Sequence, residues 1–179
     1  KTEATALKKL ELLIDGKIPL ELGRSTREKE LQSWLILNAL KNKNRLFFDT
    51  NLTFISSELA LYNEKNRVVN DILAIDSNND LVIIELKSTR EKKRIEIQVE
   101  NFTNIALENK SFFMDYIKLI TGKVWSGKTK GIAVWPDSRL SKRTISSKYR
   151  EICYLESGVK GAKKIAYNEN GDIQFKEIV

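Results

Sequence analysis

The sequence predicts an α/β fold of one domain, in which a central mixed β-sheet is flanked by helices. Amphipathic stretches at helical spacing alternate with short apolar stretches typical of strands. No internal repeat or low-complexity linker divides the chain, and 179 residues suit a single domain with a sizeable core. We therefore expect one domain over residues 1–179, with a core at about 25–137 and a basic part at 138–179.

Two helices are predicted at the start of the chain. Residues 2–14 carry apolar side chains at helical spacing, and Gly16 followed by Pro19 ends this stretch. Ser25 is a candidate N-cap for a second helix, which reaches about Asn42.

The remaining elements alternate between strands and helices. Strands are predicted at about 52–62, 68–76 and 81–87, with a hairpin turn at 77–80 between the last two. A helix from about 91 to 109 breaks at Lys110–Ser111, and a further helical segment reaches Gly122. The predicted order closes with a strand at 131–136, a basic helix at about 138–149, and strands near 151–155 and 163–178 with a turn at 168–171.

The composition excludes several classes of enzyme. The chain has no histidine, so it has no Ser-His-Asp or Cys-His nucleophile system and no histidine-based zinc site. Its one cysteine, Cys153, cannot form an internal disulfide, which fits a reducing cytoplasm, and its apolar surroundings favour a small buried hydrophobe. No apolar stretch is long enough to span a bilayer, so we expect no membrane association.

The charge balance favours an anionic partner such as nucleic acid. There are 31 Lys and Arg residues against 24 Asp and Glu residues, a formal net charge of +7. A solvated, lysine-rich surface explains the same excess without any partner. The basic excess is clearest between residues 118 and 164, and the nucleic-acid-binding candidates there are Lys123, Lys128, Lys130 and Arg143.

Two carboxylates and a lysine are expected at one end of the predicted hairpin. Side chains alternate along a strand, so Glu85 and Lys87 share one face. If Asp76 pairs with Asp80 around a three-residue loop, Asp71 lies opposite Glu85 on that same face. A register that separates these two carboxylates would remove the site.

Such a pair of carboxylates has a chemical use. Two close carboxylates are costly to keep ionised unless a hard cation such as Mg²⁺ or Mn²⁺ joins them. The metal would polarise a phosphodiester oxygen, while Lys87 would orient or deprotonate the attacking water. The alternative is a partly exposed hairpin that carries ordinary charges.

Gln98 is a further candidate site residue. The spacing of the following helix puts this amide on the same face as the buried positions Ile95, Val99 and Phe102. A buried amide needs hydrogen-bond partners, and the charged end of the hairpin is the nearest source that we expect. The alternative is a half-exposed amide at the edge of the apolar stripe.

Residues 70–102 closely resemble the core of the PD-(D/E)xK nucleases, especially the NucS-like and RecB-like branches. The departures are Asn70 in place of proline and Phe102 in place of tyrosine. The matching residues are Asp71 for the first acid, Glu85, Leu86 and Lys87 for the triplet, and Gln98 with Phe102 for the helical motif.

The resemblance implies a restriction-endonuclease-like fold and hydrolysis of DNA with bound Mg²⁺ or Mn²⁺, in repair, recombination or restriction. The oligomeric state is not determined by the sequence, and a homodimer is one alternative. The resemblance also implies a glutamate from the preceding helix, Glu28 or else Glu30, although Glu28 has a second explanation as part of a capping box with Ser25. The metal-site residues on this basis are Asp71, Glu85, Leu86 and Glu28, and the catalytic residues are Asp71, Glu85, Lys87 and Gln98.

Two other functions remain as alternatives. One is a non-catalytic nucleic-acid-binding module on the same fold. The other is a nucleotide-hydrolysing P-loop, because residues 122–129 read GKVWSGKT. A P-loop needs a helix directly after Thr129, but a predicted strand follows there, so we interpret the segment as a basic loop in which Trp125 either packs or stacks on nucleic acid.

Overall fold

The computed structural model describes residues 27–62, 67–90, 92–137, 147–158 and 163–178. The predicted helix at 2–14, its end at Gly16 and Pro19, the N-cap Ser25 and the side chain of Arg143 lie outside these ranges. Most of the predicted basic helix at 138–149 does so as well, and its last three residues form a turn and a bend instead of helix.

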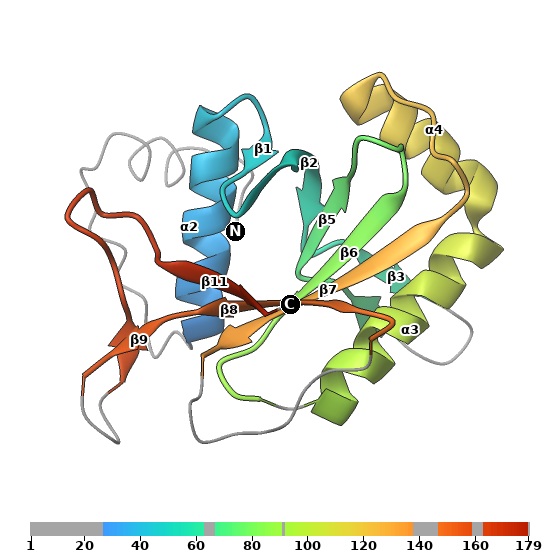
Figure 1. Ribbon diagram of the computed structural model, residues 1–179. Helices are drawn as coiled ribbons and strands as arrows, with labels where there is room; N and C mark the ends of the chain where they lie inside the picture. Colours follow the sequence, from blue (N-terminus) through green and yellow to red (C-terminus); the bar gives the residue numbers. More distant parts are fainter. Residues whose placement is uncertain (1–26, 63–66, 91, 138–146, 159–162, 179) are drawn as a thin grey trace, which may run out of the picture.

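A mixed sheet of seven strands occupies the centre of the molecule (Figure 1), in the order β1-β2-β5-β6-β7-β8-β11. The β6–β7 and β7–β8 pairs are parallel and the others are antiparallel. The predicted α/β class with a central mixed sheet is therefore confirmed. Its strands are β1 Arg45–Leu46, β2 Asp49–Ser57, β5 Ile72–Ile75, β6 Leu81–Leu86, β7 Thr129–Pro136, β8 Arg150–Tyr154 and β11 Phe175–Ile178.

Helices cover both faces of the sheet, as Figure 1 shows: α2 (Arg27–Lys41) lies on one face, and α3 (Lys92–Glu108) and α4 (Lys110–Thr121) lie on the other. Side chains of β6 alternate between two apolar clusters. Val82 and Ile84 pack on the α2 side, and Ile83 packs on the α3 side. Each such fully buried side chain contributes roughly 1.5–3 kcal/mol to folding. By this alternation Glu85 belongs to the α3 side.

Two predicted strands are each divided in the structure. The stretch at 52–62 ends as β2 at Ser57, because Glu58 adopts a left-handed backbone with φ of 52°, and the chain resumes as β3 (Ala60–Tyr62). The stretch at 68–76 is divided into β4 (Arg67–Val69) and β5. β3 and β4 pair with each other as a separate hairpin that leaves the main sheet beside the start of β5.

The C-terminal part adds β8 and β11 to the central sheet. The predicted strand at 163–178 is interrupted: it consists of β10 (Lys164–Ile165), which pairs with β9 (Glu156–Ser157), and of β11. The predicted turn at 168–171 is confirmed by a hydrogen bond from Gly171 N to Asn168 O of 3.0 Å. None of the helices in the described ranges is long and apolar enough to cross a membrane.

Candidate active site

The register of the β5–β6 hairpin places Asp71 opposite Glu85. The ladder pairs Ile72 with Ile84, and Asp71 and Glu85 are the next residues outward on the two strands. At the other end Asp76 N donates to Asp80 O at 3.1 Å, so a three-residue loop joins the strands. The register predicted from the sequence is therefore confirmed.

The backbone carbonyl and the side-chain carboxylate of Asp71 accept hydrogen bonds from different parts of the fold. Its carbonyl oxygen accepts hydrogen bonds from Glu58 N at 3.2 Å and from Gln32 Nε2 at 2.8 Å. Its carboxylate turns toward β6, where Oδ2 accepts from Leu86 N at 2.8 Å. Gln32, which sequence reasoning missed, is buried in α2, and an amide next to the apolar position Leu31 was the only signal for it.

Glu85 is fully buried in the α3-side face of the sheet. In the part of the chain that the structure describes, its Oε1 atom has no hydrogen-bond partner. Burial, and after it the charge of Asp71, raise the pKa of Glu85 to about 8, although Lys87 partly offsets both effects. Without a cation, this carboxyl group is therefore largely protonated at neutral pH.

Lys87 is held against both carboxylates. Its ammonium Nζ donates to Leu86 O at 2.9 Å and lies 3.5 Å from Glu85 Oε2 and 3.9 Å from Asp71 Oδ2. Its carbonyl oxygen accepts from the buried Tyr154 hydroxyl at 3.2 Å. Because burial raises the pKa of Tyr154, the phenol stays protonated and keeps this donor. Only 5% of the Lys87 surface is exposed, so the ammonium is fixed in place.

Glu28 from α2 lies beside this group. Its Oε1 accepts hydrogen bonds from Ser88 N at 2.8 Å and from Ser88 Oγ at 3.0 Å. Ser88 directly follows Lys87, so Glu28 ties α2 to the segment that carries the lysine. Glu30, the other glutamate considered, accepts a bond from Tyr167 OH at 2.9 Å and thus contacts the C-terminal hairpin instead.

Gln98 does not make the contact that we expected. The side chain is half-buried on α3, and its Oε1 atom is buried without a hydrogen-bond partner among the described residues. The expected hydrogen bond to this oxygen from the charged end of the hairpin is therefore not found among the described residues, and the half-buried side chain fits the alternative of an amide at the edge of the apolar stripe. Helical spacing predicted the face correctly, but it could not give the depth at which α3 packs on β6. Phe102 is fully buried and packs edge-on against Phe113.

Arg90, a second residue that sequence reasoning missed, anchors the β6–α3 connection. Its Nε donates to Pro136 O at 3.1 Å, its guanidinium stacks on Trp135 at 4.9 Å, and it forms an ion pair with the buried Glu151. Cys153 lies in the same cluster and is fully buried, which confirms its interpretation as a buried residue. Burial raises the pKa of Cys153 to about 11, so its thiol is protonated at neutral pH.

The three described lysines predicted to bind nucleic acid lie at the opposite end of the hairpin. Lys130 pairs in register with Val82, three positions before Glu85, which corresponds to about 10 Å along the strand. Its ammonium forms ion pairs with Asp76 at 2.6 Å and with Asp80 at 2.9 Å. Near it, Lys123 Nζ donates to Asp76 O at 3.2 Å, and Lys128 is exposed.

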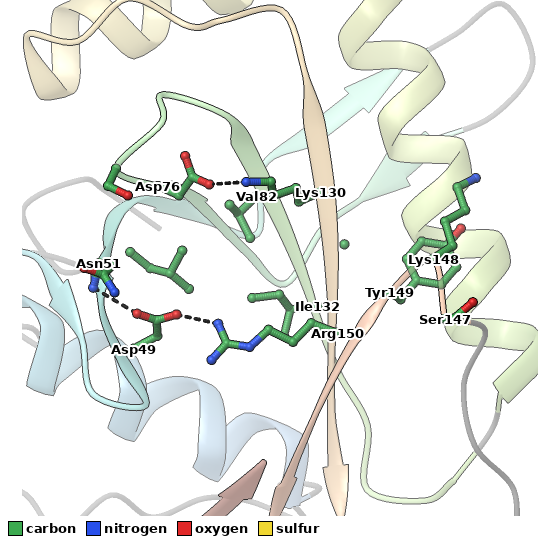
Figure 2. A pocket seen from close by; sticks show the side chains of 13 residues that line it. Asp49, Asn51, Asp76, Val82, Lys130, Ile132, Ser147, Lys148, Tyr149 and Arg150 are labelled. Carbon is green, nitrogen blue, oxygen red and sulfur yellow. Dashed lines mark hydrogen bonds and ion pairs between the residues drawn. The ribbon is translucent and has the colours of Figure 1, made fainter. Parts of the chain in front are cut away.

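These lysines therefore sit apart from Asp71, Glu85 and Lys87. Lys130 lines a pocket of about 470 Å³. Figure 2 shows two ion pairs in its lining, Asp76–Lys130 and Asp49–Arg150. The structure does not bring the predicted nucleic-acid-binding lysines together with the candidate active site. Their contact with nucleic acid stays a prediction.

The P-loop-like segment has a structural role. Thr129 begins β7, so no helix follows the segment, as the sequence predicted. Trp125 is 2% exposed, packs against Phe113 and donates from Nε1 to Lys128 O at 2.6 Å. Of the two interpretations of this residue, packing is the correct one.

The donor set at Asp71 and Glu85 fits a hard divalent cation. Mg²⁺ in proteins is commonly held by one or two carboxylates, with waters and substrate phosphates completing its shell. Glu85 offers a buried oxygen that no described residue contacts by a hydrogen bond, and Asp71 has a second oxygen besides the one bonded to Leu86. Within the described ranges, no group of three or more acidic, histidine or cysteine side chains is placed to hold a metal. Asp71 and Glu85 are therefore the candidate carboxylate ligands that the structure brings together.

Comparison with known proteins gives little further support. No protein-family model and no curated protein matches the chain. One similar solved structure is a repair endonuclease from Pyrococcus abyssi, with 16% sequence identity and a TM-score of 0.30. The match covers 59% of this chain and 37% of that chain. A likeness of this size carries no conclusion about the site.

Proposed function

We propose that this chain is a metal-dependent nuclease that hydrolyses DNA phosphodiester bonds, with Asp71 and Glu85 holding Mg²⁺ or Mn²⁺. The main support is the Glu85 carboxylate, which is fully buried beside a second carboxylate and whose Oε1 has no partner among the described residues. A buried carboxylate that serves only structure normally has its oxygens satisfied by donors. A cation bound by both carboxylates would give the Glu85 oxygen a partner and reduce the repulsion between the two negative charges.

Each residue has a distinct role in this proposal. When bound, the metal supplies a Lewis acid that polarises the phosphodiester and lowers the pKa of a coordinated water. Lys87 would donate a hydrogen bond to the attacking water or to a phosphoryl oxygen, and its charge would offset the negative charge of the transition state. Its contacts with Leu86 and Tyr154 hold it in place before substrate arrives.

The net charge of +7 is compatible with a polyanionic substrate. It does not distinguish a nuclease from a nucleic-acid-binding module, because both functions need attraction to phosphate. The fully buried Glu85 beside Asp71 and Lys87 favours the nuclease, because binding DNA alone does not require a buried carboxylate next to a second one.

The test is cleavage of labelled single-stranded, duplex and branched DNA with Mg²⁺, Mn²⁺ or EDTA. We expect cutting that needs the metal and falls by about a hundredfold or more in Asp71→Ala and in Lys87→Ala. Lys41→Ala is the matched control, because it removes an exposed ammonium in the last turn of α2, at the end of this helix far from Glu28. It should change the rate by less than about twofold.

Metal-dependent cutting that survives both Asp71→Ala and Lys87→Ala would exclude this site. Firm DNA binding without cutting under any of these metal conditions would instead favour the non-catalytic nucleic-acid-binding module.

A further inference from the structure

The β3–β4 hairpin presents an exposed aromatic ring and a cation side by side. Tyr62 on β3 pairs in register with Arg67 on β4, so the two side chains leave the same face of the hairpin. Tyr62 is 73% exposed and Arg67 is also exposed. We call these two residues the Tyr62–Arg67 pair.

This hairpin is joined directly to the candidate active site. At its base Asn70 N donates to Leu59 O at 3.3 Å, and Glu58 N donates to Asp71 O at 3.2 Å. Arg67 lies four positions before Asp71, which places its backbone at most about 13 Å away along an extended chain. The hairpin therefore lies close enough to the site to contact a polymer that extends from it.

The other face of the hairpin is packed on the protein core. Leu61 and Val68 form the neighbouring cross-strand pair and contact the apolar cluster on the α3 side of the sheet. Alternation along the strands then directs Tyr62 and Arg67 away from the core. A hairpin of two strands is marginally stable alone, so this packing is what fixes the pair as a platform.

No described cation stacks on the ring of Tyr62. In the residues that the structure describes, guanidinium and ammonium groups stack on Trp135 and on Tyr149, and none covers Tyr62. No described carboxylate forms an ion pair with Arg67. An exposed ring beside a cation matches the two needs of single-stranded nucleic acid, which are stacking for a base and a positive charge for its phosphate.

We propose that the Tyr62–Arg67 pair binds a single-stranded segment of DNA next to the cleavage site, with a base stacked on Tyr62 and a phosphate contacted by Arg67. This inference rests on the proposed nuclease function and names a preference of that same site. In duplex DNA each base is stacked between its neighbours, so only an unpaired base offers a free face to the ring. Single strands or opened ends would therefore bind more tightly than closed duplex.

The test is binding of a fluorescein-labelled single-stranded oligonucleotide and of a blunt duplex of the same sequence, measured by anisotropy in EDTA. Tyr62→Ala should weaken single-strand binding about tenfold, with a much smaller effect on the duplex, and Tyr62→Phe should bind as the wild type does. Arg67→Ala should lower the slope of log K against log salt for the single strand by about 0.7. Phe112→Ala is the control, because Phe112 is a half-exposed aromatic residue on α4, outside this hairpin.

Three outcomes would overturn the inference: wild-type single-strand affinity in Tyr62→Ala, an equal loss for both probes, or an equal loss in Phe112→Ala. Because EDTA prevents metal-dependent cutting, the outcome is independent of the nuclease proposal. If single-strand binding depends on Tyr62 as expected but no cleavage occurs, the inference about the Tyr62–Arg67 pair stands and the nuclease proposal fails. If cleavage occurs but Tyr62→Ala has no effect on binding, the nuclease proposal stands and this inference fails.

Discussion

The carboxylate of Asp71 accepts a hydrogen bond from the backbone N–H of Leu86, with 2.8 Å between Oδ2 and the nitrogen. In an antiparallel ladder such an N–H is normally paired with a carbonyl of the neighbouring strand. Here β5 begins only at Ile72, and the carbonyl of Asp71 is bonded to Glu58 N and Gln32 Nε2. The side chain replaces the missing ladder partner and is thereby fixed beside Glu85.

Asp71→Ala should destabilise the fold as well as stop cleavage. It leaves Leu86 N–H without its partner, so we expect the free energy of unfolding to fall by about 1–3 kcal/mol. Asp71→Asn keeps an acceptor oxygen and should lose less than half of that. Urea unfolding at pH 6 measures both, because Glu85 is then mostly protonated and its repulsion by Asp71 is small. Equal losses in the two variants would contradict a hydrogen-bond role.

The buried carboxyl of Glu85 should make the metal-free protein less stable as pH rises. Its pKa is raised from 4.5 to about 8 in the folded state, so between these two pH values the folded protein binds more protons than the unfolded chain does. Stability from this group is fully present below about pH 4.5 and is lost as pH rises through about 8, with a slope of up to roughly 1.4 kcal/mol per pH unit. Glu85→Gln should remove that slope in urea titrations in EDTA. An unchanged slope would show that Glu85 titrates normally.

Metal binding should be coupled to proton release by the same group. Glu85 must be ionised to bind a cation, so the apparent affinity for Mn²⁺ should rise about tenfold per pH unit below pH 8 and level off above it. Calorimetric titrations in buffers of different ionisation enthalpy measure the protons released per ion. Release that stays near zero at pH 6.5 would disprove the coupling.

Variants of Glu28 and Ser88 can distinguish the hydrogen bonds that join α2 to the Lys87 segment from a role of Glu28 in metal binding. Ser88→Ala removes one of two hydrogen bonds to Glu28 Oε1 and should cost about 0.5–1.5 kcal/mol without changing metal affinity. Glu28→Ala removes both bonds and the carboxylate. If Glu28 also serves as a ligand, only Glu28→Ala lowers the affinity for Mn²⁺ measured by calorimetry. If Glu28→Ala and Ser88→Ala both bind Mn²⁺ with wild-type affinity, Glu28 acts only through its hydrogen bonds to Ser88.

Arg90→Met should be among the most destabilising single changes. It removes the ion pair between Arg90 and the buried Glu151, and breaking a buried pair typically costs about 3–5 kcal/mol. Adding Glu151→Gln to Arg90→Met removes the negative charge, keeps an acceptor for Trp135 Nε1 and should recover part of the loss. Urea unfolding compares the variants, with the exposed Arg67→Ala as control. A loss below about 1 kcal/mol would mean that Glu151 is satisfied elsewhere.

The sequence predicted the hairpin well because local rules determine it. A three-residue turn after Asp76 sets the register, and alternation then assigns Asp71, Glu85 and Lys87 to one face. Helix bounds were close for the same reason, since capping and periodicity are local: α3 was expected at about 91–109 and spans Lys92–Glu108.

The features that were missed depend on contacts between distant segments. Nothing near Glu58 in the sequence indicates the left-handed turn that separates the β3–β4 hairpin from the sheet. Arg90 meets Glu151 only through the β6–β7–β8 pairing, and the depth at which α3 packs decides that the Gln98 oxygen has no partner among the described residues. The lysines at 123–130 were candidates because of their charge, which does not reveal at which end of a strand a residue lies.

The parallel pairing of β6 with β7 also affects the order in which the molecule assembles. β6 meets β5 across a short turn, but it meets β7 only after residues 87–128 have passed through two helices. Hairpins form in about 1–10 μs, whereas long-range parallel pairs form much later. We therefore expect Asp71 and Glu85 to come together while both still contact water. On this order Glu85 leaves the solvent only when β7 and α3 dock, so the docking rate, rather than the rate of hairpin formation, should respond to pH.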